Sequence, residues 1–405
     1  MADTAEIKVV LGRIAQRFED AEQPAEEVST ARGWGQFLDD PRTHRQTGPY
    51  GTSAGLIVSA LAGRGVAALR PRIGDLPLSW WQDWKNGGLE GRRLFCQTLR
   101  LGFFYLGLRL SHILDSDGVC AEVQEELFRR ALPSGMWGNY WTSPTSLDQT
   151  PRLFCSSIIV LCISLLNELP PELVTRLEPA LGKIEESLLG SKDIPLLYVA
   201  AASAAVLSVR GAKLGSRVRS RIRRLAWSAR ANLADLGVYF YDFEYRGEAG
   251  GTAFGRDYFI VPSEILVGIA GLQFWAPAAL RQRAEAAAKA LLLNIDTNQG
   301  VYRSDPEQRI SSKNQAWAAL LLRMSIEQRN TGSGAARTWY WLRRERKGNW
   351  FTELAFPLTS LCVITAEIVI FRGLGSLVDV LTGIGGVIIG GLYGSTFLRK
   401  WFPGR

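Results

Sequence analysis

The fold is indicated most clearly by the stretch Gly135-Met136-Trp137-Gly138-Asn139-Tyr140, which a loop connects to Ser156-Ser157-Ile158-Ile159-Val160. It is one copy of a block that recurs along the chain. In each copy a small residue and an aromatic residue form a turn, a loop follows, and a serine then opens an apolar segment. Three copies begin at Gly33, Gly135 and Gly237, each 102 residues apart, and a fourth begins at Gly300. Recurrence of this kind is typical of folds built from stacked supersecondary units.

The segments after the serines are apolar on nearly all sides, as in 158–166, 196–207 and 265–272. A helix without a polar face must be covered all round, so we expect inner helices here. The helices between them carry charge on one face and are expected to form an outer layer. We interpret each serine, such as Ser53 and Ser156, as the N-cap of an inner helix. There is little strand signal, and the Gly-rich stretch before Ser263 is interpreted as a loop.

This pattern resembles the α/α-toroid proteins, the repeat superfamily of the terpenoid cyclases and protein prenyltransferases. In that superfamily a Gly-aromatic turn precedes an inner helix in each repeat. The resemblance covers roughly residues 30–330 and implies an all-α ring of about six helical hairpins. Another array of α-hairpins, or an irregular helical domain, is the alternative.

The catalytic motifs of that superfamily are missing. No D-x-D-D motif occurs, and the nearest string, Asp115-Ser116-Asp117-Gly118, is typical of a helix cap and turn. There is no D-D-x-x-D motif, and with only His44 and His112 in the chain a zinc site is not expected. Gly51-Thr52-Ser53-Ala54-Gly55 matches the G-x-S-x-G pattern of hydrolases, but that elbow needs a strand before the serine and a loop precedes it here. We therefore expect a toroid that binds without catalysing, and neither a cofactor nor a metal.

Cations and tyrosines precede the expected inner helices. The candidate ligand-binding residues are Arg45, Tyr50, Arg152, Arg256, Tyr258 and Lys313. In a toroid, the loops that carry them converge on one mouth of the central cavity, beside helix N-termini. Such N-termini favour anions through their free N–H groups and their dipoles. We expect an anionic, nucleotide-like ligand at this mouth, with structural ion pairing as the alternative.

Two hydrophobic segments, 350–371 and 374–398, follow near the C-terminus. The second is uncharged from Val380 to Leu398, close to the roughly 20 residues that cross a bilayer as a helix. Basic residues flank both outer ends, which by the positive-inside tendency places these ends and the preceding chain in the cytoplasm. No signal peptide is visible. We expect a transmembrane hairpin in the cell inner membrane; an apolar core element of a soluble protein is the alternative.

Glycines recur every fourth residue in the second segment, at Gly386, Gly390 and Gly394. Small residues at this spacing let membrane helices approach closely, which favours a homo-oligomer; packing inside one hairpin is the alternative. Glu367 and Asp379 are acidic residues in the same region, and carboxylates at membrane depth usually face a partner or a water-filled path.

These features divide the chain into four parts. They are an N-terminal helix and acidic linker (1–30), a cytoplasmic toroid-like domain (31–335), a basic juxtamembrane linker (336–349) and the transmembrane hairpin (350–405). The chain carries a formal net charge of +8, which favours anionic partners. The basic segment 213–230 suits a solvated outer face or attraction to membrane lipids, whereas nucleic acid is not favoured because no recognised module accompanies it. Five cysteines without a C-x-x-C pair indicate buried thiols in a reducing compartment.

We predict a membrane-anchored sensor or effector. Its toroid would bind an anionic ligand or a protein partner, and its hairpin would oligomerise, as in a pore-forming effector of bacterial defence; that setting is analogy. The alternative is a monotopic terpenoid-cyclase-like or lipid-processing enzyme. Such an enzyme needs a deep apolar cavity with a buried carboxylate, for which Asp257 and Glu264 are candidates. A membrane-anchored scaffold is a third hypothesis.

Overall fold

The structure is a computed structural model. It describes residues 4–24, 32–39, 47–64, 66–73, 75–88, 91, 94–139, 150–166, 168–190, 194–228, 236–246, 252–272, 295–296, 301–302 and 309–330. The chain divides into two compact units, Met1–Glu327 and Gln328–Arg405. The expected transmembrane hairpin, with its glycine stripe and its acidic residues Glu367 and Asp379, lies outside the described residues. Within the described ranges, no helix combines the length and the apolar character needed to cross a membrane.

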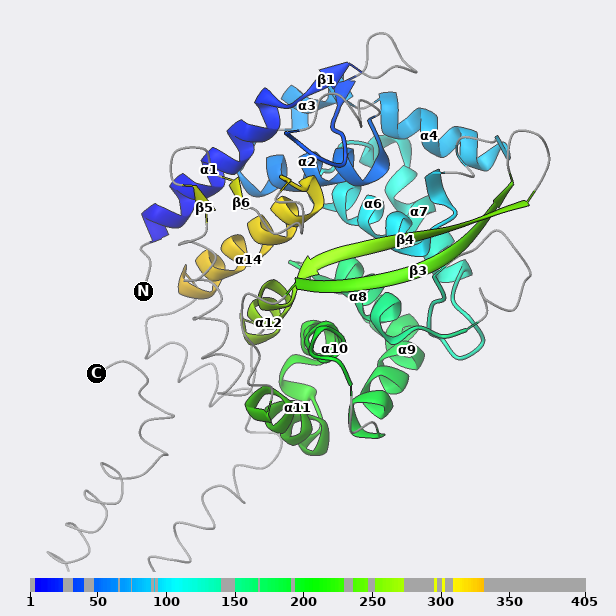
Figure 1. The fold of residues 1–405 in the computed structure, drawn as a ribbon, viewed down its shortest axis with the longest axis vertical. Helices are drawn as coiled ribbons and strands as arrows, with labels where there is room; N and C mark the ends of the chain where they lie inside the picture. The colour runs from blue at the N-terminus through cyan, green and yellow to red at the C-terminus, as the bar shows by residue number, and fades with distance from the viewer. Residues whose placement is uncertain are drawn as a thin grey trace, which may run out of the picture. The chain divides into compact units, whose positions relative to one another are not determined.

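Six of the described helices form an inner set. They are α2 (Pro49–Leu61), α6 (Thr98–Ser111), α8 (Leu153–Ser164), α10 (Leu196–Arg210), α12 (Ser263–Leu272) and α14 (Ser312–Asn330). Each of the first four packs on the next, and Gly268 of α12 lies against the side chain of Leu321 in α14. Trp317 of α14 contacts Phe103 of α6, and Lys313 of α14 lies against Tyr50 of α2. The inner helices therefore follow one another around a ring (Figure 1).

The inner helices run in the same direction. Near their starts, the rings of Phe154 in α8 and Tyr198 in α10 lie 5.7 Å apart. Near their ends, the hydroxyl groups of Ser164 in α8 and Ser208 in α10 share a hydrogen bond of 2.5 Å. The contacts between α2, α6 and α14 likewise join their first two turns. The N-termini of α2, α6 and α14 therefore lie together, and so do those of α8 and α10.

A second set of helices packs outside the inner ones. They are α1 (Thr4–Asp20), α3 (Val66–Ile73), α4 (Asp75–Lys85), α7 (Val119–Arg129), α9 (Pro171–Gly190) and α11 (Ser216–Ser228), with the short 3-10 helices η1 (Asp115–Asp117) and η2 (Gly211–Lys213) between them. The helix α1 packs on α2, α7 on α6, and α9 on both α8 and α10. In α9 the side chains of Leu177, Leu181, Ile184 and Leu188 are fully buried on one face. This is the alternation of outer and inner helices that the sequence predicts.

In two copies the tryptophan of the aromatic turn joins an outer helix to the next inner one. The indole Nε1 of Trp34 donates to the carbonyl of Phe18 near the end of α1, at 2.6 Å. In the second copy, Nε1 of Trp137 donates to the carbonyl of Leu127 near the end of α7, at 2.7 Å. Both tryptophans are 1% exposed. The repeated turn is thus a packing anchor, and a Trp is needed because its N–H satisfies a buried helix carbonyl.

The N-cap prediction is wrong for Ser53 and Ser156. The helix α2 begins at Pro49, after Gly48, and α8 begins after Arg152, so both serines lie inside their helices. The hydroxyl of Ser156 instead accepts the backbone N–H of Trp137 at 2.9 Å, which holds the aromatic turn against α8. Only the fourth copy behaves as expected among the described helices: Ser311, just before α14, accepts the backbone N–H of Asn314. Because Ser53 lies within a helix and not after a strand, a nucleophile elbow is excluded there.

The stretch expected as a loop before α12 contains a long β-hairpin. Strands β3 (Leu236–Arg246) and β4 (Thr252–Pro262) pair antiparallel, and β4 leads directly into α12 (Figure 1). The all-α prediction is therefore wrong for this stretch, where the many aromatic residues, which favour strands, outweigh the glycines. Two short pairs complete the strands: β1 (Gln23–Pro24) with β2 (Arg32–Gly33), and β5 (Ile295–Asp296) with β6 (Val301–Tyr302).

Candidate anion-binding site

Two cations meet one tyrosine where three inner helices begin. Tyr50 is the second residue of α2, Arg100 the third of α6 and Lys313 the second of α14. The ammonium nitrogen of Lys313 lies 4.4 Å from the centre of the Tyr50 ring, and the guanidinium carbon of Arg100 lies 5.2 Å from it. Both distances fall within the range of cation–π attraction, which brings the two positive charges to one place.

Aromatic rings form the inner wall behind these cations. The ring of Phe103 lies 6.0 Å from that of Tyr50 and 5.9 Å from that of Trp317. Phe103 and Trp317 are fully buried, and Lys313 is only 3% exposed. We name Tyr50, Arg100, Phe103, Lys313 and Trp317 the Tyr50 cluster.

Buried polar atoms lie on two of the three helices that form the cluster. The hydroxyl oxygens of Thr52 and Ser53 in α2 and the indole nitrogen of Trp317 in α14 are buried and have no hydrogen-bond partner among the described residues. A buried polar atom left unsatisfied costs about 1–3 kcal/mol. A polar ligand or ordered water reaching these atoms would remove that cost.

The structure places the predicted site residues in three groups. Tyr50 and Lys313 come together in the Tyr50 cluster. Arg152 is the residue that precedes α8, and its electrostatic neighbours in the described part include Tyr198 and Cys155. It is therefore placed at the start of a different inner helix, and no described contact joins it to the cluster.

The other three predicted residues are less fully described. Arg256 and Tyr258 lie in β4, where the backbone register pairs them with Asp242 and Phe240 of β3. Arg45 lies outside the described residues.

Arg100 is the residue that the sequence analysis missed. It sits in the first turn of an inner helix, at nearly the same distance from the helix start as Tyr50 and Lys313. That position was a usable signal. The recurring block does not mark Arg100, because no aromatic turn with a serine directly precedes α6.

The described residues form neither a metal site nor a reactive thiol. In the described part of the chain, no three His, Cys, Asp or Glu side chains gather closely enough to hold a metal ion. Cys155 and Cys162 are buried free thiols, and Cys120 is partly buried. Burial raises the pKa of Cys162 to about 12 and that of Cys120 to about 11. These thiols therefore stay protonated at neutral pH and are poor nucleophiles.

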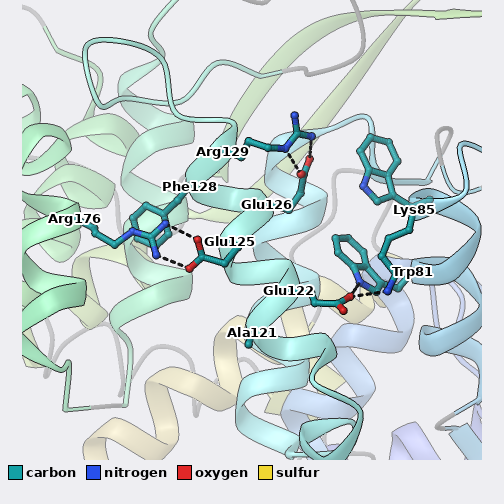
Figure 2. Close-up of a pocket in the computed structure, with 10 residues that line it drawn as sticks. Trp81, Lys85, Ala121, Glu122, Glu125, Glu126, Phe128, Arg129 and Arg176 are labelled. Carbon is teal, nitrogen blue, oxygen red and sulfur yellow. Dashed lines mark hydrogen bonds and ion pairs between the residues drawn. The ribbon is translucent and has the colours of Figure 1, made fainter.

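An outer groove between α4, α7 and α9 has a volume of about 750 Å³ and contains several ion pairs (Figure 2). Glu122 accepts hydrogen bonds from Lys85 at 2.9 Å and from Nε1 of Trp81 at 2.6 Å, and these bonds lower the pKa of its carboxyl group. Glu125 and Arg176 form a two-point ion pair across the groove. The charged groups of the groove pair with one another, so we interpret it as a junction between outer helices.

Comparison with known proteins identifies the architecture. No family model matches the chain, and no curated protein matches its sequence. The similar solved structures include two inactive variants of the alpha-1,6-mannanase GH76A of Salegentibacter sp. HEL1_6, one in complex with alpha-1,6-mannotriose and one with alpha-1,6-mannotetrose. The first has a TM-score of 0.50 and 13% identity over 80% of this chain and 99% of the other. The second has a TM-score of 0.50 and 14% identity over 81% and 100%.

The mannanase has an α/α-toroid fold. Identities of 13% and 14% carry information on fold alone. The mostly helical, toroid-like architecture predicted from the recurring blocks is thereby confirmed.

Proposed function

We propose that this chain is a membrane-anchored sensor or effector whose toroid binds an anionic ligand at the Tyr50 cluster. The observation that carries this proposal is the meeting of Arg100 and Lys313 at the ring of Tyr50, in the first turns of three inner helices. The expected partner is a small molecule with a phosphate or carboxylate group.

Electrostatics at this end of the ring favours an anion. The N-termini of α2, α6 and α14 each contribute a partial positive charge from the helix dipole. Lys313 is almost fully buried, and charges interact more strongly where water is excluded. Two cations beside three helix N-termini would therefore be stabilised by an anion. If they served only to hold Tyr50 in place, their replacement would change stability without changing ligand binding.

The membrane part of the proposal depends on the C-terminal sequence. Gly386, Gly390 and Gly394 would form the contact between copies of the hairpin, and Glu367 and Asp379 would face that contact or a water-filled path. For a ligand to control assembly, it must bind the assembled and unassembled states with different affinity. A pore-forming effector of bacterial defence would work in this way.

Mass spectrometry of small molecules released by heating the purified full chain is the test. A phosphorylated or carboxylated compound is expected from the wild type and should be lost from Lys313→Gln and Arg100→Gln. The matched control is Lys183→Gln, which removes the same charge from a side chain that is 52% exposed on the outer helix α9. Equal retention by all four proteins would contradict the site. A retained prenyl or polyprenyl lipid would instead favour the lipid-processing enzyme.

A further inference from the structure

The helix α11 presents positive charge to solvent on one face. Lys213, Arg217, Arg223 and Arg224 are exposed, and we name these four side chains the α11 basic face. No Asp or Glu occurs between residues 213 and 228. Arg217, Arg223 and Arg224 span about two turns of α11, and Lys213 lies in the 3-10 helix η2 just before it. One extended anionic partner could cover all four charges.

The opposite face of α11 is fixed to the toroid. Leu214 and Val218 are each 4% exposed and Ile222 is fully buried. The helix packs on α9 and α10, and the guanidinium of Arg221 donates to the carbonyl of Leu188 in α9 at 3.0 Å. Because the apolar stripe is already used in the fold, α11 does not insert into a bilayer; it holds the basic face in a fixed orientation.

The α11 basic face has no ion pairs within the described part of the chain. Glu178 and Glu185 of the neighbouring helix α9 both bind Arg210, at 2.6 and 2.9 Å, and Glu186 binds Lys183 at 2.8 Å. The nearby carboxylates are therefore occupied by other cations. The charge of the basic face is left for an external partner.

An exposed apolar side chain borders this face. Leu189 is 45% exposed and directly follows Leu188, whose carbonyl binds Arg221 of α11. Exposed leucine beside clustered Lys and Arg is typical of surfaces that contact the headgroup layer of a membrane, where cations meet phosphates and the apolar side chain enters the interface. A nucleic-acid backbone would pair with the cations, but it has no apolar region that could cover the Leu189 side chain.

We infer that the α11 basic face and Leu189 bind anionic phospholipid headgroups and orient the toroid against the membrane. The inference uses the membrane location from the proposed function but not its ligand site. Each Lys or Arg near an anionic surface contributes about a fivefold gain in association, so four give a gain on the order of several hundredfold at low salt. Salt of about 1 M, where the Debye length is about 3 Å, should remove it.

Lysine footprinting of the full chain on vesicles is the test. Acylation of Lys213 is compared on phosphatidylserine-rich and on neutral phosphatidylcholine vesicles, with Lys85 of α4 as the internal reference. We expect labelling of Lys213 relative to Lys85 to fall at least fivefold on the anionic vesicles and to recover at high salt. Equal labelling on the two kinds of vesicle would overturn the inference.

Two variants make the test specific. Combined Arg217→Gln, Arg223→Gln and Arg224→Gln should abolish the protection of Lys213 without lowering the unfolding temperature, because these side chains are exposed. Combined Lys8→Gln, Arg70→Gln and Arg129→Gln removes the same charge from α1, α3 and α7, away from α9 and α11, and should leave the protection intact. Protection that survives the first variant, or that duplex RNA produces and vesicles do not, would overturn the inference. Co-sedimentation with neutral vesicles reports separately on the predicted hairpin, so the two failures can be told apart.

Discussion

Replacing Gly55 by alanine should destabilise the toroid strongly, although alanine is the better helix former. Gly55 lies inside α2, directly under the ring of Trp34. A Cβ atom there would lie 2.2 Å from Cε3 of that ring and 2.4 Å from two further ring atoms. Such atoms normally stay at least about 3.5 Å apart, so the Trp34 ring would have to move by about 1.3 Å.

The surroundings of Trp34 prevent its ring from moving aside. It is 1% exposed, and its Nε1 is held by the carbonyl of Phe18. Overpacking of a core costs about 1–3 kcal/mol, and losing the indole bond to a buried carbonyl costs about 1–3 kcal/mol more. The gain in helix propensity offsets only about 1 kcal/mol. We expect Gly55→Ala to lower the free energy of unfolding by roughly 3 kcal/mol.

Urea unfolding of the full chain in mild detergent, followed by circular dichroism, measures this effect. A loss of this size should move the urea midpoint down by about 1 M. Gly12→Ala is the matched control: Gly12 is exposed on α1, with nothing within 4 Å of its added Cβ. It should raise the midpoint slightly, because it gains about 0.5–1 kcal/mol of helix propensity. If Gly55→Ala were neutral or stabilising like Gly12→Ala, the anchoring role of Trp34 would be refuted.

Three further predictions concern other parts of the chain. Trp137→Phe removes the N–H that binds the carbonyl of Leu127 and should lower the free energy of unfolding by about 1–3 kcal/mol in the same urea assay; an unchanged midpoint would contradict the anchor. Burial raises the pKa of Tyr105 from 10.0 to about 12, so its protonated form contributes stability that is present below pH 10 and lost as the pH rises towards 12. Tyr105→Phe should therefore lessen the fall in the free energy of unfolding between pH 9 and 11, by about 1 kcal/mol per pH unit above pH 10. An identical fall in both proteins would count against this reasoning. Gly390→Leu should reduce the oligomer size in detergent while the helical circular dichroism of the toroid is kept, and an unchanged size would rule out the glycine stripe as the contact.

Part of the candidate site was predictable from local sequence, and part was not. Tyr50 and Lys313 were identified because each directly begins an apolar helix that follows a recurring turn. Arg100 was not, because its significance comes only from its neighbours across the ring. The N-cap prediction is wrong for a related reason. Ser53 packs closely against Gly107 of α6, and the Ser156 hydroxyl accepts the N–H of Trp137. A sequence pattern cannot distinguish these uses of serine from capping.

The sequence by itself determined the alternation of inner and outer helices. Segments such as 158–164 have no polar face, and a helix of that kind is stable only when other helices cover it on every side. Outer helices such as α9 carry charge that must remain in water, so their place also follows from local pattern. The tertiary structure decided which side chains meet. Tyr50, Arg100 and Lys313 are far apart in sequence, and they come together only because the ring closes through α14 and its helices run parallel. Such contacts depend on the distance between elements, and no local pattern of residues encodes that distance.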